Sequence, residues 1–592
     1  MMKQPIVITG EGIISAIGCN TAEVLDSLRK RRTGIGTMKY LHSIHREIPV
    51  GEVPLSNDDM RQQLGLQDES LLNRTTLMGM LAVRQALDNA GISRESVQQQ
   101  SLRLVLISGT TVAGMDVTEQ LFSQLEQSDE ALRCLNYHSA GSCTRRMADY
   151  FGIFAEYTTL STACSSAANA LLVGARMLQE GTADIVVAGG SEALSVFHLN
   201  GFNSLMILDH EPCRPFDATR AGLNLGEGAA YVVMETADLA LRRGVKSYGY
   251  LSGYGNACDA FHQTASSDDG EGAYLSMTEA LRMAQLAPCD IQYVNAHGTG
   301  TPNNDLSESV ALKRVFGQQL PFVSSTKSFT GHTTSSSGGI ESVICLLALQ
   351  HQFIPANLGW SQAMDDGIVP TLGEDHYPLQ HVVCNSFGFG GNDTSLVFSL
   401  KPTTSLNSDT PCENEVKILS KVEITSDDDL KELSRYVKPM EARRMGKLMR
   451  SSLLASLKAL EAAGIETPDA IITGTAMGCL ANSERLLAKM IEEGETSMSP
   501  TLFMQSTHNT ISSNIAICLG CHGYNTTYTQ DEDSLSWAMR DARQLLKSGR
   551  CKTVLVGCHD EATPTYQRMQ KRLGVKVHPE FHSIAIVLTC GK

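Results

Sequence analysis

The sequence predicts an α/β fold with largely buried sheets. Short β-branched runs alternate with stretches of helical period along most of the chain, and glycine or polar breaks separate them. This alternation is typical of strands joined by helices that cover both faces of a sheet. With 592 residues, 42% of them hydrophobic, the chain can form several cores. The expected strands include residues 6–9, 104–107, 185–188, 231–234 and 396–398, and the expected helices include residues 77–89 and 342–350.

A polar segment divides the chain. Residues 401–415 (KPTTSLNSDTPCENE) are rich in Pro, Ser, Thr and Asn and have no hydrophobic period, so we expect a linker there. After the linker, short motifs of the first part recur in the same order at a nearly constant offset, which indicates an internal repeat. Residues 415–592 are therefore interpreted as a diverged second copy of residues 1–240. The matching pairs include LDNAGI and LEAAGI (87–92 and 460–465), VLISGT and AIITGT (105–110 and 470–475), and DIVVAG and KTVLVG (184–189 and 552–557).

Composition excludes some classes of protein and favours others. The net charge is −16, which argues against a protein that binds nucleic acid through bulk charge. No run of about 18 apolar residues occurs, so no membrane span is expected. The first residues lack the apolar stretch of a signal peptide. The 16 cysteines are scattered singly, which suits free thiols in a reducing compartment, so we expect a cytoplasmic location.

One cysteine lies at a position that favours reactivity. In STACSSA (161–167), Cys164 follows a strand-like run and precedes an Ala/Leu-rich helix. At the start of a helix the backbone N–H groups and the dipole favour a thiolate, and the same N–H groups can receive an oxyanion. Taken alone, the residue could equally be a small buried cysteine at a helix start.

Two further segments each hold a histidine among glycines and hydroxyl residues. NAHGTGTP (295–302) predicts a loop at the end of a strand, and STKSFTGH (325–332) places Lys327 five residues before His332. An ordinary turn, a capping histidine or a solvated lysine would explain each segment alone. With Cys164 and the glycine-rich turn NSFGFGGN (385–392), they supply the groups needed for acyl transfer through a thioester. Spacing alone does not bring these groups together in space.

The motifs resemble those of a known family. STACSSA, VAGGSEA, RPFDATRAGLNLGEGAA, VNAHGTGTPNND, SSTKSFTGH and NSFGFGGND occur in the order found in the elongating β-ketoacyl-acyl-carrier-protein synthases, or ketosynthases. The resemblance implies the thiolase fold, with five layers in the order α-β-α-β-α and usually a dimer. It implies one thiolase half in residues 1–250 and the other in 251–400. Residues 416–592 would add an α/β unit resembling the first half.

The resemblance also assigns catalytic roles. Cys164 would be the nucleophile that takes the acyl chain. His297 and His332 would bind the thioester carbonyl of a malonyl donor, support loss of CO2 and stabilise the enolate. Lys327 would hold the electrostatic environment of His332, and Glu341 would be a supporting carboxylate.

Other residues are assigned to binding. The backbone N–H groups of Cys164 and Phe389 would form the oxyanion hole, and Phe389 would also be the gate beside the thiol. Thr299 and Thr301 would contact a phosphopantetheine arm, and Val112 would limit the acyl pocket. The remaining candidates are Phe387 in the glycine-rich turn and Arg214 on a rim for an acidic carrier protein.

The implied reaction is a decarboxylative Claisen condensation that yields a 3-oxoacyl thioester, in fatty-acid or polyketide/polyene biosynthesis. No metal or bound cofactor is expected, because both acyl groups would arrive on the phosphopantetheine of an acyl carrier protein. An acyltransferase, a malonyl decarboxylase and a non-catalytic scaffold stay open as alternatives. The polar run TTSSSGG after His332 departs from the family pattern and leaves chain length and donor open.

The C-terminal copy lacks the nucleophile. At the position of Cys164 the repeat places Asp531 or Glu532, depending on one gap, and a carboxylate cannot replace a thiolate in transthioesterification. The unit is similar to half of a chain length factor, the Cys-less partner of a ketosynthase, and we expect it to pack on a ketosynthase body. The protein is expected to form a homodimer or to use a ketosynthase-like partner. The CLGCH run at 518–522 resembles a haem-attachment motif, but its place at a helix end disfavours haem. The sequence offers no second Cys/His pair at ligand spacing, which disfavours zinc.

Overall fold

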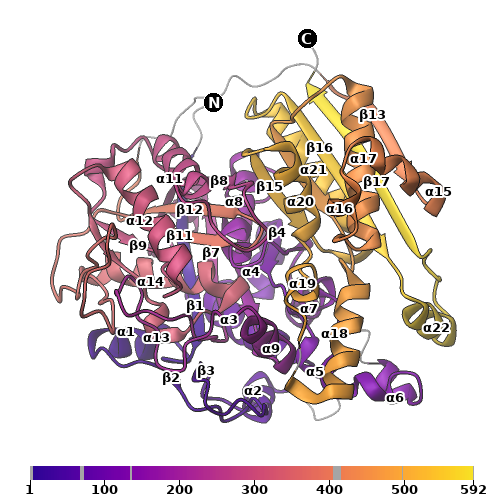
Figure 1. Ribbon diagram of the computed structural model, residues 1–592. Helices are drawn as coiled ribbons and strands as arrows, with labels where there is room; N and C mark the ends of the chain where they lie inside the picture. The colour runs from indigo at the N-terminus through magenta and orange to yellow at the C-terminus, as the bar shows by residue number, and fades with distance from the viewer. Residues whose placement is uncertain (1–3, 67–71, 134–136, 404–414, 497, 591–592) are drawn as a thin grey trace.

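The computed structural model describes residues 4–66, 72–133, 137–403, 415–496 and 498–590 (Figure 1). Most of the expected linker, residues 404–414, lies outside the described residues. The described chain contains three copies of one five-stranded arrangement, and all three join in a single 15-stranded sheet. In each copy the first strand lies beside the fifth, followed in space by the fourth, the second and the third.

The strands of the three copies correspond one to one. The first pairs antiparallel with the fifth and the fifth antiparallel with the fourth, whereas the second, third and fourth run parallel. The first copy comprises β1 (Ile6–Ser15), β4 (Leu104–Gly109), β5 (Glu156–Leu160), β6 (Ile185–Glu192) and β7 (Gly228–Thr236). The second comprises β8 (Gly249–Cys258), β9 (Tyr293–Asn295), β10 (Phe322–Ser324), β11 (His381–Gly388) and β12 (Asn392–Ser399). The third comprises β13 (Val416–Ile424), β14 (Ala470–Gly474), β15 (Tyr524–Tyr528), β16 (Thr553–Glu561) and β17 (Phe581–Cys590).

The helices of the first two copies complete five layers. α3 covers the outer face of the first sheet, α8 and α14 fill the space between the two sheets, and α11 covers the outer face of the second. This confirms the predicted thiolase fold. The helices are α1 (Thr21–Arg29), α2 (Asn57–Leu64), α3 (Arg74–Asn89), α4 (Arg94–Gln100), α5 (Met115–Leu121), α6 (Asp129–Arg133), α7 (Ala140–Phe151), α8 (Ser166–Gln179), α9 (Val196–Ser204), α10 (Ala237–Arg243), α11 (Glu271–Ala284), α12 (Pro302–Phe316), α13 (Lys327–Thr330) and α14 (Ser337–His351).

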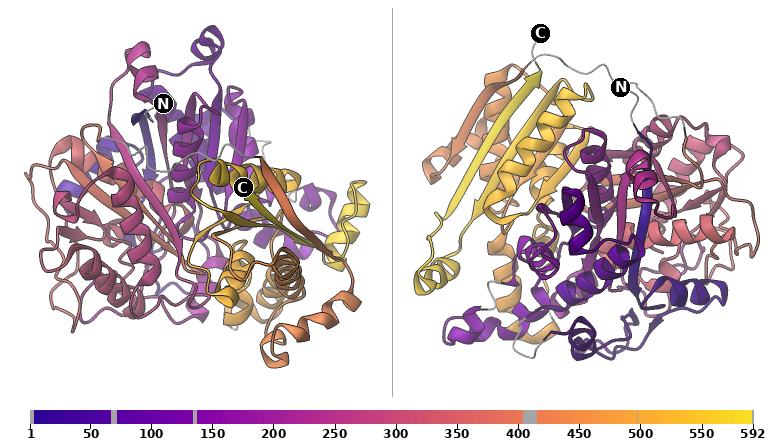
Figure 2. Two further views of the ribbon diagram at one scale, coloured as in Figure 1. Left: turned by 90° about the horizontal axis from the view of Figure 1, so that it is seen from above. Right: turned by 180° about the vertical axis from the view of Figure 1, so that it is seen from behind.

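The third copy, which we call the C-terminal unit, is the predicted extra α/β unit resembling the first half. α17 covers one face of its sheet and α21 the other. Its helices are α15 (Asp427–Leu430), α16 (Pro439–Ala442), α17 (Lys447–Ala463), α18 (Leu480–Glu493), α19 (Pro500–Met504), α20 (Thr510–Leu519), α21 (Ser534–Lys547) and α22 (Pro564–Leu573). Views from above and behind show the unit along one side of the two thiolase halves, which we call the body (Figure 2).

The C-terminal unit docks on the edge strand of the first half. Tyr528 of β15 pairs antiparallel with Leu160 of β5. The Ser161 amide donates to Thr527 over 3.0 Å, and the Thr529 amide donates to Thr159 over 2.9 Å. An edge strand left bare invites pairing with another chain, and here the same chain covers it. The ketosynthase-like partner expected from the sequence is therefore supplied within the molecule.

The two sides of this contact mirror each other. α18 and α19 of the C-terminal unit pack on α9, which follows β6. Conversely, α22, which follows β16, meets the segment around α6, where Arg568 Nε donates to Glu126 Oε1 over 2.8 Å. Between the two contacts, Arg176 of α8 forms a buried ion pair with Asp541 of α21. The third strands of the two units, β5 and β15, thus meet at the centre of a contact between equivalent elements.

Most described cysteines are free thiols, as expected from their scattered positions. Cys590, at the end of β17, departs from that expectation because it is disulfide-bonded. Among the described residues, no helix is both long and apolar enough to cross a bilayer.

Candidate active site

Cys164 lies on the turn between β5 and α8. The preceding residue, Ala163, has φ 51°, in the left-handed region. Ser166 Oγ donates to the Ala163 carbonyl over 2.6 Å and accepts from the Thr162 amide over 2.9 Å. These bonds hold a strained turn that aims the thiol away from the sheet, and only 4% of Cys164 is exposed.

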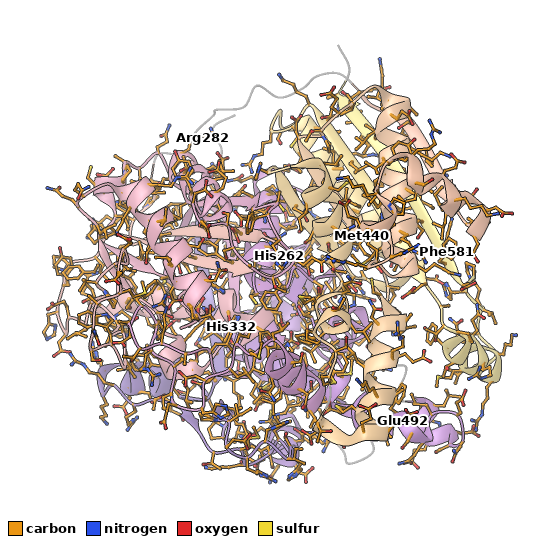
Figure 3. All side chains as sticks on the ribbon, viewed as in Figure 1. His262, Arg282, His332, Met440, Glu492 and Phe581 are labelled. Atoms are coloured by element: carbon orange, nitrogen blue, oxygen red, sulfur yellow. The ribbon has the colours of Figure 1, made fainter. Side chains whose placement is uncertain are left out.

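Two imidazoles stand beside the thiol. Nε2 of His332 lies 3.1 Å from Sγ of Cys164, and Nδ1 of the same ring lies 3.1 Å from Ser337 Oγ. The ring of His297 is 5.3 Å from that of His332, with the ring planes at 84°. His332 lies well inside the body (Figure 3). The structure thus brings together three residues that are up to 168 positions apart in the sequence.

Burial governs the charge states of these groups. Desolvation, with a smaller contribution from the Lys327 charge, holds the pKa of both His297 and His332 well below the ordinary value, so both rings are neutral near pH 7. Desolvation also raises the pKa of the Cys164 thiol to about 12, although Lys327 and the Phe389 N–H oppose it. The thiolate expected from the start of a helix is therefore not the resting state. Burial outweighs the helix dipole, and the proton must leave when the sulfur reacts.

A buried ion pair lies behind the imidazoles. Nζ of Lys327, on α13, is 2.5 Å from Oε1 of Glu341, on α14, and both side chains are almost fully buried. Burial raises the pKa of Glu341 to about 7, against the lowering effect of Lys327. Lys327 acts on the histidines through its charge and makes no direct hydrogen bond to either ring among the described contacts.

Two carboxylates that the sequence analysis did not single out position the site loops. Glu308 of α12 accepts from the amides of His297 (2.8 Å) and Gly298 (2.7 Å). Glu192, at the end of β6, accepts from the amides of Thr111 (2.8 Å) and Val112 (3.1 Å) and from the Ser335 hydroxyl. Buried carboxylates are rarely left without partners, so Glu192 in VAGGSEA was a signal that could have been used.

Two cavities meet at Cys164. The outer cavity, of about 380 Å³, is lined by predicted site residues that include His297, His332, Thr299, Thr301 and Phe387. The Thr299 and Thr301 hydroxyls lie 2.9 Å apart on its wall. The inner cavity is narrower, about 70 Å³, and Val112 lines it.

Phe389 stands at the junction of the two cavities. It lines both, as does Phe202, on which it stacks at 5.5 Å with ring planes 20° apart. The Phe389 N–H points at the Cys164 sulfur. The position therefore suits both a gate and an N–H donor next to the thiol.

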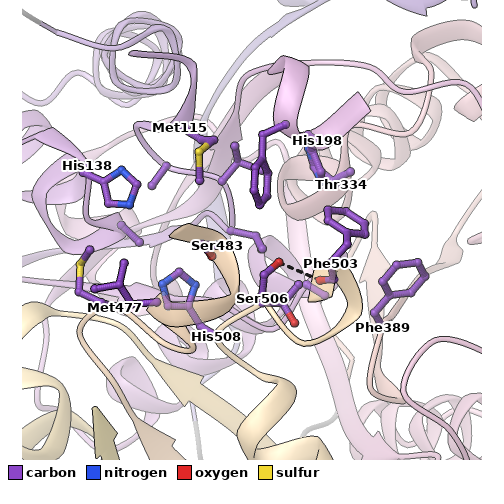
Figure 4. Close-up of a pocket in the computed structure, with 18 of the residues that line it drawn as sticks. Met115, His138, His198, Thr334, Phe389, Met477, Ser483, Phe503, Ser506 and His508 are labelled. Carbon is purple, nitrogen blue, oxygen red and sulfur yellow. Dashed lines mark hydrogen bonds between the residues drawn. The ribbon is translucent and has the colours of Figure 1, made fainter. Parts of the chain in front are cut away.

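The C-terminal unit closes the inner cavity. Phe503 of α19 lies 5.5 Å from the ring of Phe202 and packs on Gly201, where any added side chain would collide with it. His508 reaches the Cys164 turn, its Nδ1 being 3.0 Å from Ser161 Oγ (Figure 4). The sequence analysis missed this contribution entirely. The residues from this unit that line the inner cavity are Met477, Leu480, Ser483, Phe503, Ser506, Thr507 and His508.

Arg214 is the predicted site residue that lies apart from the others. It lines neither cavity, and its guanidinium is held by Asp209 (3.1 Å) and by the Thr219 carbonyl (3.0 Å). Its role on a carrier-protein rim stays a prediction.

The equivalent turn of the C-terminal unit carries Glu532 in place of the thiol. Asp531 has φ 48°, like Ala163, and Ser534 Oγ donates to the Asp531 carbonyl over 2.7 Å, as Ser166 does to Ala163. This match settles the alignment that the sequence left open. Within the described residues, no group of three or more His, Cys, Asp or Glu side chains is arranged to hold a metal ion.

Comparisons with known proteins define the class. The model of the β-ketoacyl synthase N-terminal domain matches residues 3–240 and 396–579, and that of the C-terminal domain matches residues 248–361. The chain therefore belongs to the β-ketoacyl synthase family. It is 31% identical over 415 residues to 3-oxoacyl-[acyl-carrier-protein] synthase 2 of Vibrio harveyi, covering 67% of this chain and 99% of the relative. A Synechocystis protein of the same name is 31% identical over 416 residues, covering 67% of this chain and 98% of the relative.

Two similar solved structures match different shares of the chain. The ishigamide ketosynthase/chain length factor has a TM-score of 0.62 and 28% identity, covering 67% of this chain and 100% of that one. The PfaC keto synthase-chain length factor has a TM-score of 0.78 over 99% of this chain and 78% of that one, and its 16% identity supports a shared fold alone.

Proposed function

We propose that the protein condenses a Cys164-bound acyl chain with a malonyl group carried by acyl carrier protein, giving 3-oxoacyl-acyl-carrier-protein. The observation that carries the proposal is the thiol of Cys164, 3.1 Å from Nε2 of His332 and close to His297, at the junction of an outer and an inner cavity. A thiol nucleophile with two neutral imidazoles fits both halves of this reaction.

The first half loads the chain. The Cys164 sulfur attacks the acyl thioester carbonyl and its proton passes to Nε2 of His332, which matters because the thiol is protonated at rest. The N–H groups of Cys164 and Phe389 receive the oxyanion. Collapse of the intermediate releases the carrier thiolate, which takes the proton back from His332. The acyl chain then occupies the inner cavity.

The second half makes the carbon–carbon bond. An N–H from each imidazole, His297 and His332, binds the malonyl thioester oxygen, where negative charge develops as CO2 leaves. Ser337 Oγ can serve either tautomer of His332, because a hydroxyl both donates and accepts. The enolate carbon attacks the acyl carbonyl, and the Cys164 thiolate leaves. It takes up one proton from solvent, which is the proton that the overall reaction consumes.

The partners follow from the same scheme. Both acyl groups reach Cys164 on the phosphopantetheine arm of acyl carrier protein, and Thr299 and Thr301 of the outer cavity contact that arm. The C-terminal unit acts as a chain-length-factor-like half that closes the acyl cavity and has no condensing activity of its own. A homodimer through the β5 edge is disfavoured because β15 occupies that edge. The cytoplasmic location stays a prediction.

The test separates acylation, decarboxylation and condensation. Cys164→Ala should form no acyl-enzyme by intact-mass measurement, yet still release CO2 from malonyl-acyl carrier protein. His297→Ala should still be acylated but should lose decarboxylation, and His332→Ala should be impaired in both. Condensed product from Cys164→Ala protein would refute the nucleophile assignment. Transfer or CO2 release without a new carbon–carbon bond in the wild type would favour the acyltransferase or decarboxylase alternative.

A further inference from the structure

One side of the inner cavity carries two imidazoles, which an aliphatic acyl chain does not require. His138 and His508 line the cavity on the side away from Phe389 (Figure 4). They occupy equivalent places in two units, since His138 precedes α7 of the body and His508 precedes α20 of the C-terminal unit. Both residues are partly buried. The rest of the lining combines aromatic and aliphatic side chains with His198 and several Ser and Thr residues.

Each ring is oriented by one nitrogen only. His138 Nδ1 lies 2.6 Å from Thr118 Oγ1, and His508 Nδ1 lies 3.0 Å from Ser161 Oγ. In the part of the chain that the structure describes, Nε2 of each ring has no hydrogen-bond partner. The second nitrogen of each imidazole is therefore available to an occupant of the cavity.

Two hydroxyls extend the same pattern. The Oγ1 atoms of Thr111 and Thr334 are buried on the cavity wall and have no hydrogen-bond partner among the described residues. Buried polar groups normally find partners, and leaving one unpaired against a bound hydrocarbon costs about tenfold or more in affinity. A saturated chain would leave both imidazole Nε2 atoms unpaired, whereas an oxygenated chain would pair one or both of them.

The charge of the site narrows the class of ligand. Burial lowers the pKa of His138 and His508 to about 4, so both imidazoles are neutral at physiological pH. A neutral imidazole can donate or accept at Nε2, depending on its tautomer. It suits a neutral hydroxyl or carbonyl better than a carboxylate, which would need a cation.

We propose that the inner cavity selects acyl chains bearing a neutral oxygen function, a hydroxyl or carbonyl, and that Nε2 of His138 and His508 reads it on the side of the cavity away from Phe389. This inference rests on the proposed function, because it assumes that the chain is bound to Cys164. It makes His508 a specificity residue contributed by a unit that has no nucleophile of its own.

The experiment compares matched acyl chains. Acylation of Cys164 is followed by intact mass with saturated acyl-carrier-protein thioesters of six to twelve carbons and their ω-hydroxy counterparts. We expect the wild type to prefer the hydroxylated chain by roughly tenfold or more at the best-fitting length. Equal rates for the two series at every length would overturn the proposal.

Variants assign the preference to the imidazole. His508→Leu should bring the ratio of the two acylation rates, hydroxylated over saturated, close to one. His508→Gln, which keeps a donor and an acceptor, should keep part of the wild-type ratio. His376→Leu, an exposed histidine outside both cavities, is the matched control and should behave as the wild type. If His508→Leu fails to fold, the chain-length series on wild type and His508→Gln decides the matter.

The outcomes also separate this inference from the function beneath it. If neither series acylates Cys164, the proposed function fails. If acylation and condensation proceed with no preference for the hydroxylated chain, or if His508→Leu keeps the preference, only the specificity proposal fails.

Discussion

The turn that carries Cys164 and the turn that carries Glu532 have the same backbone and opposite chemistry. Both place a non-glycine residue in the left-handed region, Ala163 at 51° and Asp531 at 48°, and both are tied by a serine hydroxyl three residues later. The C-terminal unit keeps the strained turn without the thiol. The geometry is thus a property of the strand-to-helix connection, and catalysis depends on what surrounds it.

The helices after the two turns show what changed. α8 is almost wholly buried, because it packs between two sheets and against α14. α21 is amphipathic and exposes Ser536, Arg543 and Lys547, since no second half covers that face. Residues 416–592 can stand without a second thiolase half because the sequence of α21 has become polar where α8 is apolar.

Deletion of residues 415–592 should have the largest effect on turnover and assembly. The deletion exposes the β5 edge, opens the inner cavity and leaves Arg176 without Asp541. We expect condensation to be lost because the inner cavity loses one wall, and we expect self-association because the β5 edge is left bare. Turnover and light scattering measure both. Unchanged assembly and turnover in the truncated protein would show that the unit is dispensable.

Asp541→Ala should loosen the same contact without removing the unit. The Arg176–Asp541 pair is almost fully buried, so loss of one partner should cost about 3–5 kcal/mol of unfolding free energy. The matched control is Arg540→Ala, whose pair with Glu156 is partly exposed and worth about 1 kcal/mol or less. Urea unfolding followed by circular dichroism gives the unfolding free energy of each variant. Equal effects from the two variants would contradict this account.

The pH dependence of Cys164 alkylation tests whether burial or the helix dipole dominates the pKa of the thiol. Because burial raises its pKa to about 12, the thiolate fraction should rise with pH throughout the range from 7 to 9. The rate of iodoacetamide labelling should therefore increase roughly tenfold per pH unit. Peptide mass spectrometry at the Cys164 peptide gives this rate directly. A plateau in that range would mean that the thiol ionises at a much lower pH.

The Glu532→Cys variant should have the smallest effect on acylation of the protein. The variant restores a thiol on the equivalent turn, but no histidine hydrogen-bonds to that position among the described residues. We expect one acyl group per chain by intact mass, as in the wild type. The double variant with Cys164→Ala should remain unacylated, and any adduct on it would show that the turn alone activates a thiol.

Sequence motifs indicated the residues around Cys164, but they did not indicate which residues close the inner cavity. STACSSA, HGTGT and TKSFTGH each place a reactive group on a loop between regular elements, so their chemistry can be read locally. Phe503 and His508 belong to the same cavity, yet they reach it only because β15 pairs with β5. Such a contact depends on docking between two units, which no local pattern records.

The charge state of the thiol depends on its burial as well as on its place at the start of a helix. Position at the start of α8 suggested a thiolate, but the depth of Cys164 depends on Phe389 and on the segments stacked over the turn. The α/β class was predictable because it rests on strand and helix periodicity along the chain. The five layers followed from the family resemblance, and the repeat followed from motifs that recur in the same order. Burial and docking depend on the assembled molecule.

Because the body and its C-terminal unit belong to one chain, the two parts are always made in equal amounts. Two separate subunits must find each other, and their pairing weakens on dilution, whereas a tethered pair experiences a high effective concentration however little protein is made. Each molecule therefore contains one nucleophilic Cys164 and one C-terminal unit that closes the inner cavity, in a fixed ratio of one to one.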